Sequence, residues 1–336
     1  MKKRAIYPLL LLLVVSLILS ACSNKKSLTT KTEQITLTLG AAGQTSLPAI
    51  GASERFAELV AEKTNNRIKI KFFPSRQLGD DDQLIEQVMI GAVDIASIST
   101  SSFSKFTPLL QSLQMPFLLN SYEKEYKAIT SKEMQDIYKK LEELNIKTLS
   151  IYDNGIRHFA NVKRPINNTS DLKGLKLRVP GSKLLLDSVK ALGANPTPMA
   201  YGEIYTGLQT KVIDGEEINL TSIYSEKHYE VLDYVSTIGL WPFPASLCMN
   251  LEAFNKLSPE DRKIIQDCAD EGLKYNMNLF EEKEKTAIKA MEEKGVKINK
   301  IDNTKPFVEA TEHIYEEYMA KDPLIRSFVN MAREIK

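Results

Sequence analysis

One arginine stands where an α/β protein presents groups to a ligand. Arg178 lies near the end of residues 174–179, which alternate as a strand does and are closed by Pro180. A guanidinium can grip a carboxylate through two parallel hydrogen bonds. The position therefore indicates a carboxylate-binding residue, although an arginine at a strand end can equally be a solvated surface residue.

Acidic and hydroxyl side chains occupy comparable positions earlier in the chain. Asp80, Asp81 and Asp82 begin a predicted helix, and the hydroxyl residues 99–102 follow a predicted strand. Such groups suit the hydroxyls of a sugar, and we take Asp81 and Ser99 as candidate ligand contacts. Three aspartates at a helix start are also what N-capping and the helix dipole favour, so the structural interpretation stays open.

The single tryptophan, Trp241, lies in residues 239–244, where we expect the chain to cross back from a second domain to a first. Crossings between domains line clefts. Trp241 is therefore a candidate for stacking on a ligand, and the alternative is packing at the domain junction.

Catalytic signatures are absent from the sequence. It contains no H-E-x-x-H, G-x-S-x-G or G-x-x-x-x-G-K-[ST] pattern, and no G-x-G-x-x-G follows the first predicted strand. His228 and His313 have the surroundings of helix-surface residues. Cys248 and Cys268 form no C-x-x-C pair and are expected to be small buried side chains, with a disulfide as the alternative. We expect no enzyme, metal site or cofactor.

Segments with the apolar spacing of strands alternate along the chain with segments that have the apolar spacing of helices, and these elements must position the residues named above. Residues 34–39, 67–73 and 93–98 have the pattern of strands, and residues 53–60 and 83–90 have that of helices. This alternation predicts a largely parallel sheet with ligands at the strand ends. A second α/β unit begins near Tyr152, and its helix 183–192 ends before Gly193, a suitable helix terminator.

A long helix is predicted from Ser258 onward. Ser258 is a candidate N-cap, Pro259 fits the first helical position, and no strong stop appears before Gly295. At 1.5 Å per residue such a helix would be about 55 Å long, so we expect it to run along both domains. The alternative is two shorter helices broken near Gly272.

The N-terminus has the form of a lipoprotein signal. Lys2, Lys3 and Arg4 precede a largely apolar run, residues 7–19, which is shorter than the roughly 20 residues that a membrane-spanning helix needs. The run ends at Leu-Ser-Ala-Cys, residues 19–22, which resembles the lipobox of bacterial lipoproteins. We therefore expect a signal peptide over 1–21, lipidation of Cys22, and a polar tether over 22–33.

Charge and length limit the remaining possibilities. Residues 1–21 hold three of the 44 basic residues and none of the 43 acidic ones, leaving 41 against 43 and a net charge of −2. The sequence has no basic patch that would suggest binding to nucleic acid. About 300 mature residues exceed what one core usually organises, so two domains are expected.

Four blocks of the chain carry a recognisable pattern. They are Pro-Ser-Arg-Gln-Leu-Gly-Asp-Asp at 74–81, Leu-Lys-Gly-Leu-Lys-Leu-Arg-Val-Pro at 172–180, Gly-Ala-Asn-Pro-Thr-Pro-Met at 193–199 and Asp-Gly-Glu-Glu at 214–217. In this order they resemble the DctP-type solute-binding proteins of tripartite ATP-independent periplasmic (TRAP) transporters. The likeness covers nearly the whole mature chain and weakens only after about Gly295.

The resemblance implies roles for individual residues. Arg178 falls at the position of the arginine that clamps the ligand carboxylate, and Arg157 falls near a second family arginine, with a spacing one residue longer than in the sialic-acid-binding members. Tyr201 matches an aromatic residue that lies against the ligand in many members. Glu203 also matches, with bracing of the adjoining helix as the alternative role.

One departure from the family pattern concerns the segment after Asp214. Many relatives read Asp-Gly-x-Glu-Asn, so Glu217 matches, but Ile218 replaces the usual Asn. Asn219 could supply the missing amide only if it turns toward the ligand. This departure puts a sialic acid ligand in doubt.

The resemblance also implies an architecture and a function. We expect an α/β, two-domain periplasmic-binding-protein architecture with a hinge and a long helix along both domains. The first domain would comprise residues 34–153 plus about 244–284, and the second 154–243 plus about 285–336. The protein would sit on the outer side of the cell membrane through its lipid anchor. It would bind a small organic acid, a sugar acid such as a uronate or a C4-dicarboxylate, and deliver it to the TRAP membrane subunits. The alternative is a co-sensor for a membrane histidine kinase.

Overall fold

One strand, β4 (Ile146–Asn161), belongs to both halves of a mixed sheet. Its first part pairs antiparallel with β9 (Pro242–Asn250), and its last residues pair antiparallel with β7 (Gly215–Asn219) and β8 (Tyr234–Thr237). The computed structural model that shows this arrangement describes residues 34–335, and Ile35 onward forms one compact unit. The predicted signal peptide and Cys22 lie outside the described residues.

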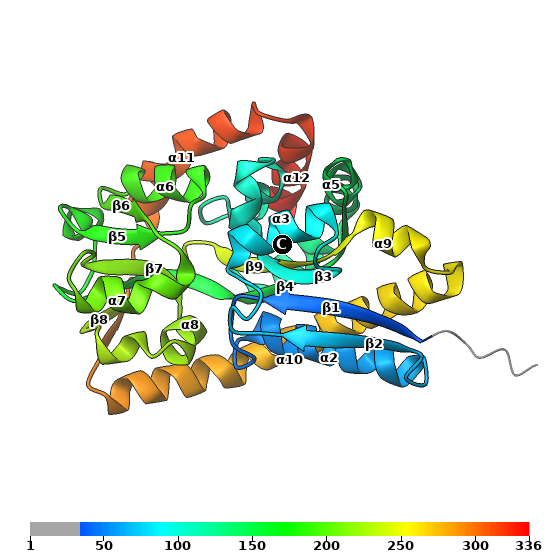
Figure 1. Cartoon of the computed structure of the whole chain (residues 1–336). Helices are drawn as coiled ribbons and strands as arrows, with labels where there is room; N and C mark the ends of the chain where they lie inside the picture. The colour runs from blue at the N-terminus through cyan, green and yellow to red at the C-terminus, as the bar shows by residue number, and fades with distance from the viewer. Residues whose placement is uncertain (1–33, 336) are drawn as a thin grey trace, which may run out of the picture. The chain divides into compact units, whose positions relative to one another are not determined.

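The first half of the sheet, with the helices packed on it, is called the first lobe. Its strand order is β2-β1-β3-β9-β4, in which β1 pairs parallel with β2 and β3 (Figure 1). All five residues of β3 are buried, as expected for a central strand covered on both faces. The elements are β1 (Ile35–Ala41), β2 (Ile68–Phe73), β3 (Ile95–Ser99), α2 (Pro48–Lys63), α3 (Asp81–Ile90), α4 (Tyr122–Ile129), α5 (Lys132–Leu141) and α9 (Leu251–Lys256), with 3₁₀ turns at Thr100–Lys105, Leu109–Gln114 and Glu142–Leu144.

The other half of the sheet, with its helices, is called the second lobe. Here β5 pairs parallel with β7 and β6, and β10 pairs parallel with β8. Two hydrophobic clusters separate from the first-lobe core fill this lobe. The elements are β5 (Lys176–Val179), β6 (Asn195–Pro198), β7, β8, β10 (Lys297–Lys300), α6 (Lys183–Ala191), α7 (Ile204–Gln209) and α8 (Leu220–Ser225), with 3₁₀ turns at Thr169–Leu172, Tyr201–Glu203 and His228–Glu230.

The long helix α10 (Pro259–Glu293) is continuous and joins the two lobes. Ser258 caps it by accepting a hydrogen bond from the backbone of Asp261, as predicted. The helix runs from one lobe to the other (Figure 1). Cys268 in its first half belongs to the first-lobe core, and Met291 in its second half belongs to a second-lobe cluster. Gly272 does not break the helix. A Cβ there would lie 2.2 Å from Oη of Tyr152, so this glycine permits close packing.

The C-terminal helices return to the first lobe. Side chains from Ile314 to Ala332, on α11 (Lys305–Met319) and α12 (Pro323–Glu334), belong to the first-lobe core. This packing argues for placing residues from about 314 onward with the first domain, not the second. The other domain boundaries given above stay predictions.

Several expectations from sequence are met, and two besides the boundary near residue 314 need correction. Helices 53–60 and 83–90 lie inside α2 and α3, helix 183–192 matches α6 except for its last residue, and Cys248 and Cys268 are buried free thiols. The sheet is mixed and not largely parallel, because β4 and β9 cross between the lobes in opposite directions. His228 is 1% exposed and not a surface residue.

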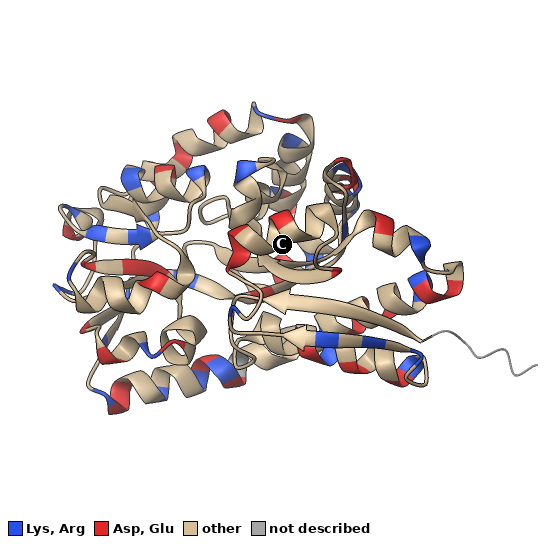
Figure 2. Cartoon of the chain, in the orientation of Figure 1, with Lys and Arg blue, Asp and Glu red and all other residues tan. Residues whose placement is uncertain are grey.

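Charged residues of both signs are scattered over both lobes (Figure 2). Within residues 34–335, none of the helices is long and apolar enough to cross a membrane. The same part of the chain holds no group of His, Cys, Asp and Glu side chains able to bind a metal ion.

Candidate functional site

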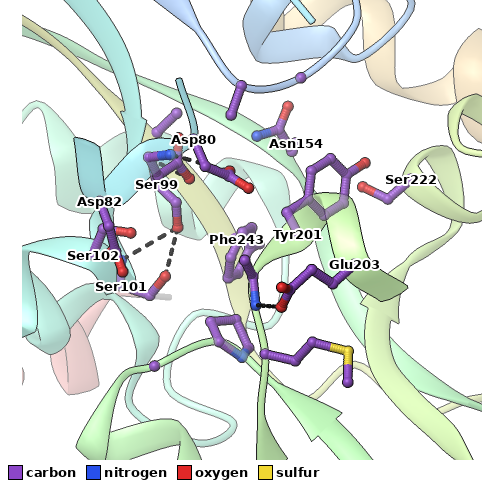
Figure 3. Close-up of a pocket in the computed structure, with 18 of the residues that line it drawn as sticks. Asp80, Asp82, Ser99, Ser101, Ser102, Asn154, Tyr201, Glu203, Ser222 and Phe243 are labelled. Carbon is purple, nitrogen blue, oxygen red and sulfur yellow. Dashed lines mark hydrogen bonds between the residues drawn. The ribbon is translucent and has the colours of Figure 1, made fainter. Parts of the chain in front are cut away.

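A cavity of about 630 Å³ lies between the two lobes. This volume falls in the range typical of small-molecule sites. Figure 3 shows acidic and hydroxyl side chains of residues 80–102 on one side and Tyr201, Glu203 and Ser222 on the other. The polar side chains among its lining are Asp80, Asp81, Asp82, Gln83, Ser97, Ser99, Ser101, Ser102, Lys105, Asn154, Arg178, Tyr201, Glu203 and Ser222.

Arg178 brings a buried positive charge to this cavity. It sits in β5, its side chain is 3% exposed, and its Nε donates to the carbonyl oxygen of Met199 at 2.9 Å. No hydrogen bond joins Nη1 or Nη2 to another residue among 34–335. Burial, with a smaller contribution from Arg157, lowers the pKa of Arg178 to about 10. The guanidinium is thus held with two nitrogens available to an anion.

Asp81 supplies a carboxyl group on the facing wall. Asp80 caps α3, and Oδ2 of Asp81 accepts a hydrogen bond from the backbone of Ser99 at 3.3 Å. Burial and the neighbouring charge of Asp80 raise the pKa of Asp81 to about 7. The capping role expected for the aspartates and their place in the cavity wall are both observed.

Hydroxyl and amide groups complete the polar lining. Ser99 and Ser101 share a hydrogen bond of 2.7 Å between their Oγ atoms, which orients them along the wall (Figure 3). Oδ1 of Asn154 accepts from the backbone of Ala49 at 3.2 Å, and no other described residue bonds its Nδ2. The buried Oη of Tyr201 has no hydrogen-bond partner among the described residues. The hydroxyls of Ser99 and Ser101 and the amide of Asn154 can therefore form hydrogen bonds with ligand hydroxyls.

Two aromatic rings from the second lobe and from β9 line the apolar part of the cavity. Tyr201 begins the 3₁₀ turn before α7, and Phe243 lies in β9 close to the lobe junction. Glu203 braces the same turn by accepting from the backbone of Ala200 at 3.2 Å, and its side chain also lines the cavity. Flat rings of this kind can pack against the C–H face of a sugar.

Arg157 does not line the cavity. Its Nε and Nη2 bind the two carboxylate oxygens of Glu217 at 2.6 and 2.9 Å, and its Nη1 bonds Oδ1 of Asn219 at 3.2 Å. Its guanidinium lies 4.0 Å from the centre of the Phe243 ring, which does line the cavity. The structure therefore places the predicted ligand contact Arg157 behind the wall, because Glu217 already neutralises it.

Asn219, Glu217 and Trp241 are also outside the lining. Nδ2 of Asn219 donates to the carbonyl of Asn154 at 2.7 Å and to Thr221, so its amide does not face the cavity in place of the family Asn. Ile218 points into a second-lobe hydrophobic cluster. Trp241 is fully buried in the other second-lobe cluster. Its position agrees with packing at the domain junction and not with stacking on a ligand.

Sequence reasoning missed Phe243 and Asn154. Phe243 stands two residues before Ala245, which also lines the cavity, and the period of a strand places both on one face. That alternation was available from sequence, whereas the rarity of tryptophan drew the assignment to Trp241. Asn154 is set by an irregularity of β4 between Asp153 and Ile156, which no sequence pattern announces.

Comparisons with known proteins agree with this geometry. A family model described as bacterial extracellular solute-binding protein, family 7 (DctP), matches residues 40–322. A solute-binding protein of Chromohalobacter salexigens is 34% identical over 84% of each chain, and the 2,3-diketo-L-gulonate-binding periplasmic protein YiaO of Escherichia coli is 31% identical over 81% of this chain and 83% of its own.

Solved structures share the fold. A TRAP periplasmic solute-binding protein from Roseobacter denitrificans, with bound β-D-glucuronate, has a TM-score of 0.85 at 30% identity, covering 90% of this chain and all of that one. A second, from Chromohalobacter salexigens with bound D-glucuronate, has a TM-score of 0.85 at 32% identity, covering 89% of this chain and 99% of that one. The predicted α/β, two-domain binding-protein fold is confirmed. The chain belongs to the DctP family, family 7 of the bacterial extracellular solute-binding proteins.

Proposed function

We propose that this chain captures a sugar acid with a single carboxylate outside the cytoplasm and delivers it to a TRAP membrane transporter. The observation that supports this most strongly is the buried Arg178 guanidinium, with two nitrogens unbonded to the described protein, on the wall of the inter-lobe cavity. A buried charge is costly unless it is paired, so the site is prepared for an anion. A ligand carboxylate would supply two charge-assisted hydrogen bonds.

The charges around the cavity favour one carboxylate over two. Lys105 lines the cavity as well, but its Nζ is paired with Asp82 at 2.6 Å. The wall otherwise carries the acidic side chains of Asp80, Asp81 and Glu203. A second ligand carboxylate would meet these groups, whereas sugar hydroxyls could donate to them. A uronate is thus favoured over a C4-dicarboxylate.

Bound ligands of the relatives support the same class. The two structures named above contain glucuronate, and a TRAP periplasmic solute-binding protein from Sulfitobacter contains β-D-galacturonate, at 32% identity and a TM-score of 0.84. The rings of Tyr201 and Phe243 give this chain the apolar surface that a pyranose would need.

A thermal-shift comparison of organic acids tests the proposal. A ligand that binds only the folded state at about 100 times its Kd raises stability by about 2.7 kcal/mol. We expect D-glucuronate or D-galacturonate to raise the melting temperature, and succinate and the neutral sugar D-glucose to have little effect. Stabilisation by succinate without any by the uronates would contradict a single-carboxylate site.

We also propose that Cys22 carries a lipid that anchors the chain at the membrane. The support is the lipobox-like Leu-Ser-Ala-Cys after an apolar run. Cys22→Ala should move the protein from the membrane fraction to the soluble extracytoplasmic fraction. A variant that stays membrane-bound as firmly as the parent would exclude this anchor.

Delivery to TRAP membrane subunits is proposed from the family resemblance, and a sensor kinase is the alternative recipient. Genes for two TRAP membrane subunits beside this gene would support transport. A neighbouring sensor-kinase gene without them would argue for signalling.

A further inference from the structure

An ion pair joins the two lobes beside the cavity. Nη2 of Arg76, in the turn after β2 of the first lobe, lies 3.1 Å from Oε2 of Glu226, at the C-terminal end of α8 in the second lobe. Gln44, also from the first lobe, adds a hydrogen bond of 3.4 Å to the same carboxylate. The cavity lining includes neither Arg76 nor Glu226.

Arg76 is fixed to the first lobe by its backbone. Ser75 and Arg76 both adopt positive φ angles, 56° and 64°, in a turn that side-chain-bearing residues seldom form. Their amides donate to the carbonyl oxygens of Gly43 at 2.8 Å and Ala41 at 3.1 Å, at the end of β1. These two hydrogen bonds hold the turn against the end of β1, and from there the Arg76 side chain reaches Glu226.

The guanidinium of Arg76 also touches residues that line the cavity. Its Nη1 lies 3.3 Å from the carbonyl oxygen of Ala42, and its Cζ lies 5.7 Å from the centre of the Tyr201 ring. Gly202 leaves room for it, since a Cβ there would lie 3.1 Å from Cδ and Nε of Arg76. Arg76 therefore connects the cavity walls of both lobes.

An ordinary surface ion pair would contribute little. This pair differs in two respects. The Glu226 side chain is only 11% exposed, and the Arg76 side chain 30%, so solvent screens the pair less than a fully exposed one. The two residues also stand on opposite lobes, so the contact can exist only while the lobes are together.

We infer that Arg76 and Glu226 form a clasp that holds the lobes together and sets how long a ligand stays in the cavity. The inference rests on the proposed binding function. A contact present in the closed state and lost in the open one stabilises only the closed state. Breaking it should speed dissociation and change association little, because most affinity differences within one site arise in the dissociation rate. Arg76 and Glu226 thus act by holding the two lobes together and not by contacting the ligand.

Stopped-flow dissociation of D-glucuronate from the full chain tests the clasp. Arg76→Ala and Glu226→Gln should each speed dissociation about 5- to 30-fold, as expected for loss of a partly buried charged hydrogen bond. The double variant should be no faster than the single ones, since they break one interaction. Arg55→Ala is the matched control: it removes ion pairs confined to α2 and should leave the rate unchanged.

A ligand-free measurement separates the clasp from the identity of the ligand. Spin labels at Lys71→Cys in β2 and Lys190→Cys in α6 report the distance between the lobes, and Arg76→Ala should shift this distance to longer values. If the parent fails to bind D-glucuronate while the distance still lengthens, the ligand is wrong and the clasp stands. An unchanged distance in Arg76→Ala, or single-variant rates that simply multiply in the double variant, would overturn the clasp.

Discussion

At the scale of single residues, the site depends on two ionisable side chains, Arg178 and Asp81. Burial disfavours the charged form of each of them unless it has a partner. Arg178 is a buried cation on the cavity wall whose Nη1 and Nη2 bond no described residue, and Asp81 is a carboxyl group whose pKa is raised to about 7 by burial. A bound carboxylate would favour the charge on Arg178 and disfavour ionisation of Asp81. The two groups should therefore respond to a ligand in opposite directions.

Asp81 should link uronate binding to proton uptake. The ligand's negative charge would raise the pKa of Asp81 above its ligand-free value of about 7, so the complex binds more protons than the free protein. Affinity should thus increase as the pH falls from 8 to 6, by about 2- to 5-fold for a pKa change of about half a unit to one unit.

Calorimetry of D-glucuronate binding at pH 6 and pH 8 checks this. Asp81→Asn should bind with the same affinity at both pH values. Asp136→Asn, on an exposed side chain of α5 that pairs with Lys132 and does not line the cavity, is the control and should keep the pH dependence of the parent. Equal affinities of the parent at the two pH values would remove Asp81 from this role.

At the scale of secondary structure, the crossing of β4 and β9 between the lobes is held by one carboxyl group. Asp153 accepts hydrogen bonds from the backbones of Gly155 at 3.0 Å and Phe243 at 3.1 Å, and Asn276 of α10 bonds its main chain in both directions. Asp153 therefore ties β4, β9 and α10 together next to the aromatic ring of the cavity.

Glu125 of α4 is buried beside Asp153. Both oxygens of Glu125 lack a donor among the described residues, which a proton shared with Asp153 would supply. Burial raises the pKa of both carboxyl groups. Tyr122 and Glu284, joined by a hydrogen bond of 2.6 Å, lie in the same region, and burial raises the pKa of both.

The two buried carboxyl groups of Glu125 and Asp153 should make folding stability depend on pH. The pKa values of these two groups are raised in the folded state. At pH values just above the ordinary pKa of a carboxyl group, the folded protein therefore binds more protons than the unfolded chain. The stability from this pair is present at low pH and is lost as the pH rises through the raised values. Thermal unfolding should show a larger fall in melting temperature from pH 5.5 to pH 8 for the parent than for Glu125→Gln.

Glu123→Gln, on the same helix but exposed, is the control and should behave as the parent does. If Glu125→Gln and the parent lose the same stability over this pH range, the two buried carboxyl groups do not share a proton.

The sequence predicted the elements with strong local signals. The cap at Ser258 and the absence of a stop before Gly295 predicted α10, and alternating residues that end at Pro180 predicted the position of Arg178. The mixed sheet was not predicted, because pairing of β4 with β9 joins residues about 100 positions apart and leaves no periodic mark. The neutralisation of Arg157 by Glu217, 60 positions away, and the burial of His228 against Glu216 of β7, 12 positions away, likewise depend on tertiary contacts that leave no periodic mark.

At the scale of the whole molecule, two lobes share one sheet, one long helix and one cavity. The cavity wall takes Asp81 and Ser99 from the first lobe and Arg178 and Tyr201 from the second, so a ligand would contact both. The return of α11 and α12 to the first lobe adds a further connection that the chain order did not suggest. Closure of the lobes and retention of the ligand are thus coupled through the cavity.

The most direct test of the central claim is calorimetry of D-glucuronate binding to the parent, Arg178→Ala and Arg178→Lys. Leaving a buried ligand charge without its partner costs roughly 3–5 kcal/mol, or about a 100- to 4,000-fold loss of affinity. Arg178→Ala should therefore nearly abolish binding, and Arg178→Lys should bind weakly because a point charge cannot form two parallel hydrogen bonds.

The controls separate binding from folding. Lys176→Ala, an exposed residue of the same strand, should bind as the parent does. Without ligand, Arg178→Ala should melt no more than a few degrees below the parent, since it removes an unpaired buried charge. We expect Arg178→Ala to lose at least about 100-fold in affinity with the fold retained; binding within threefold of the parent would contradict the role of Arg178 as the carboxylate clamp.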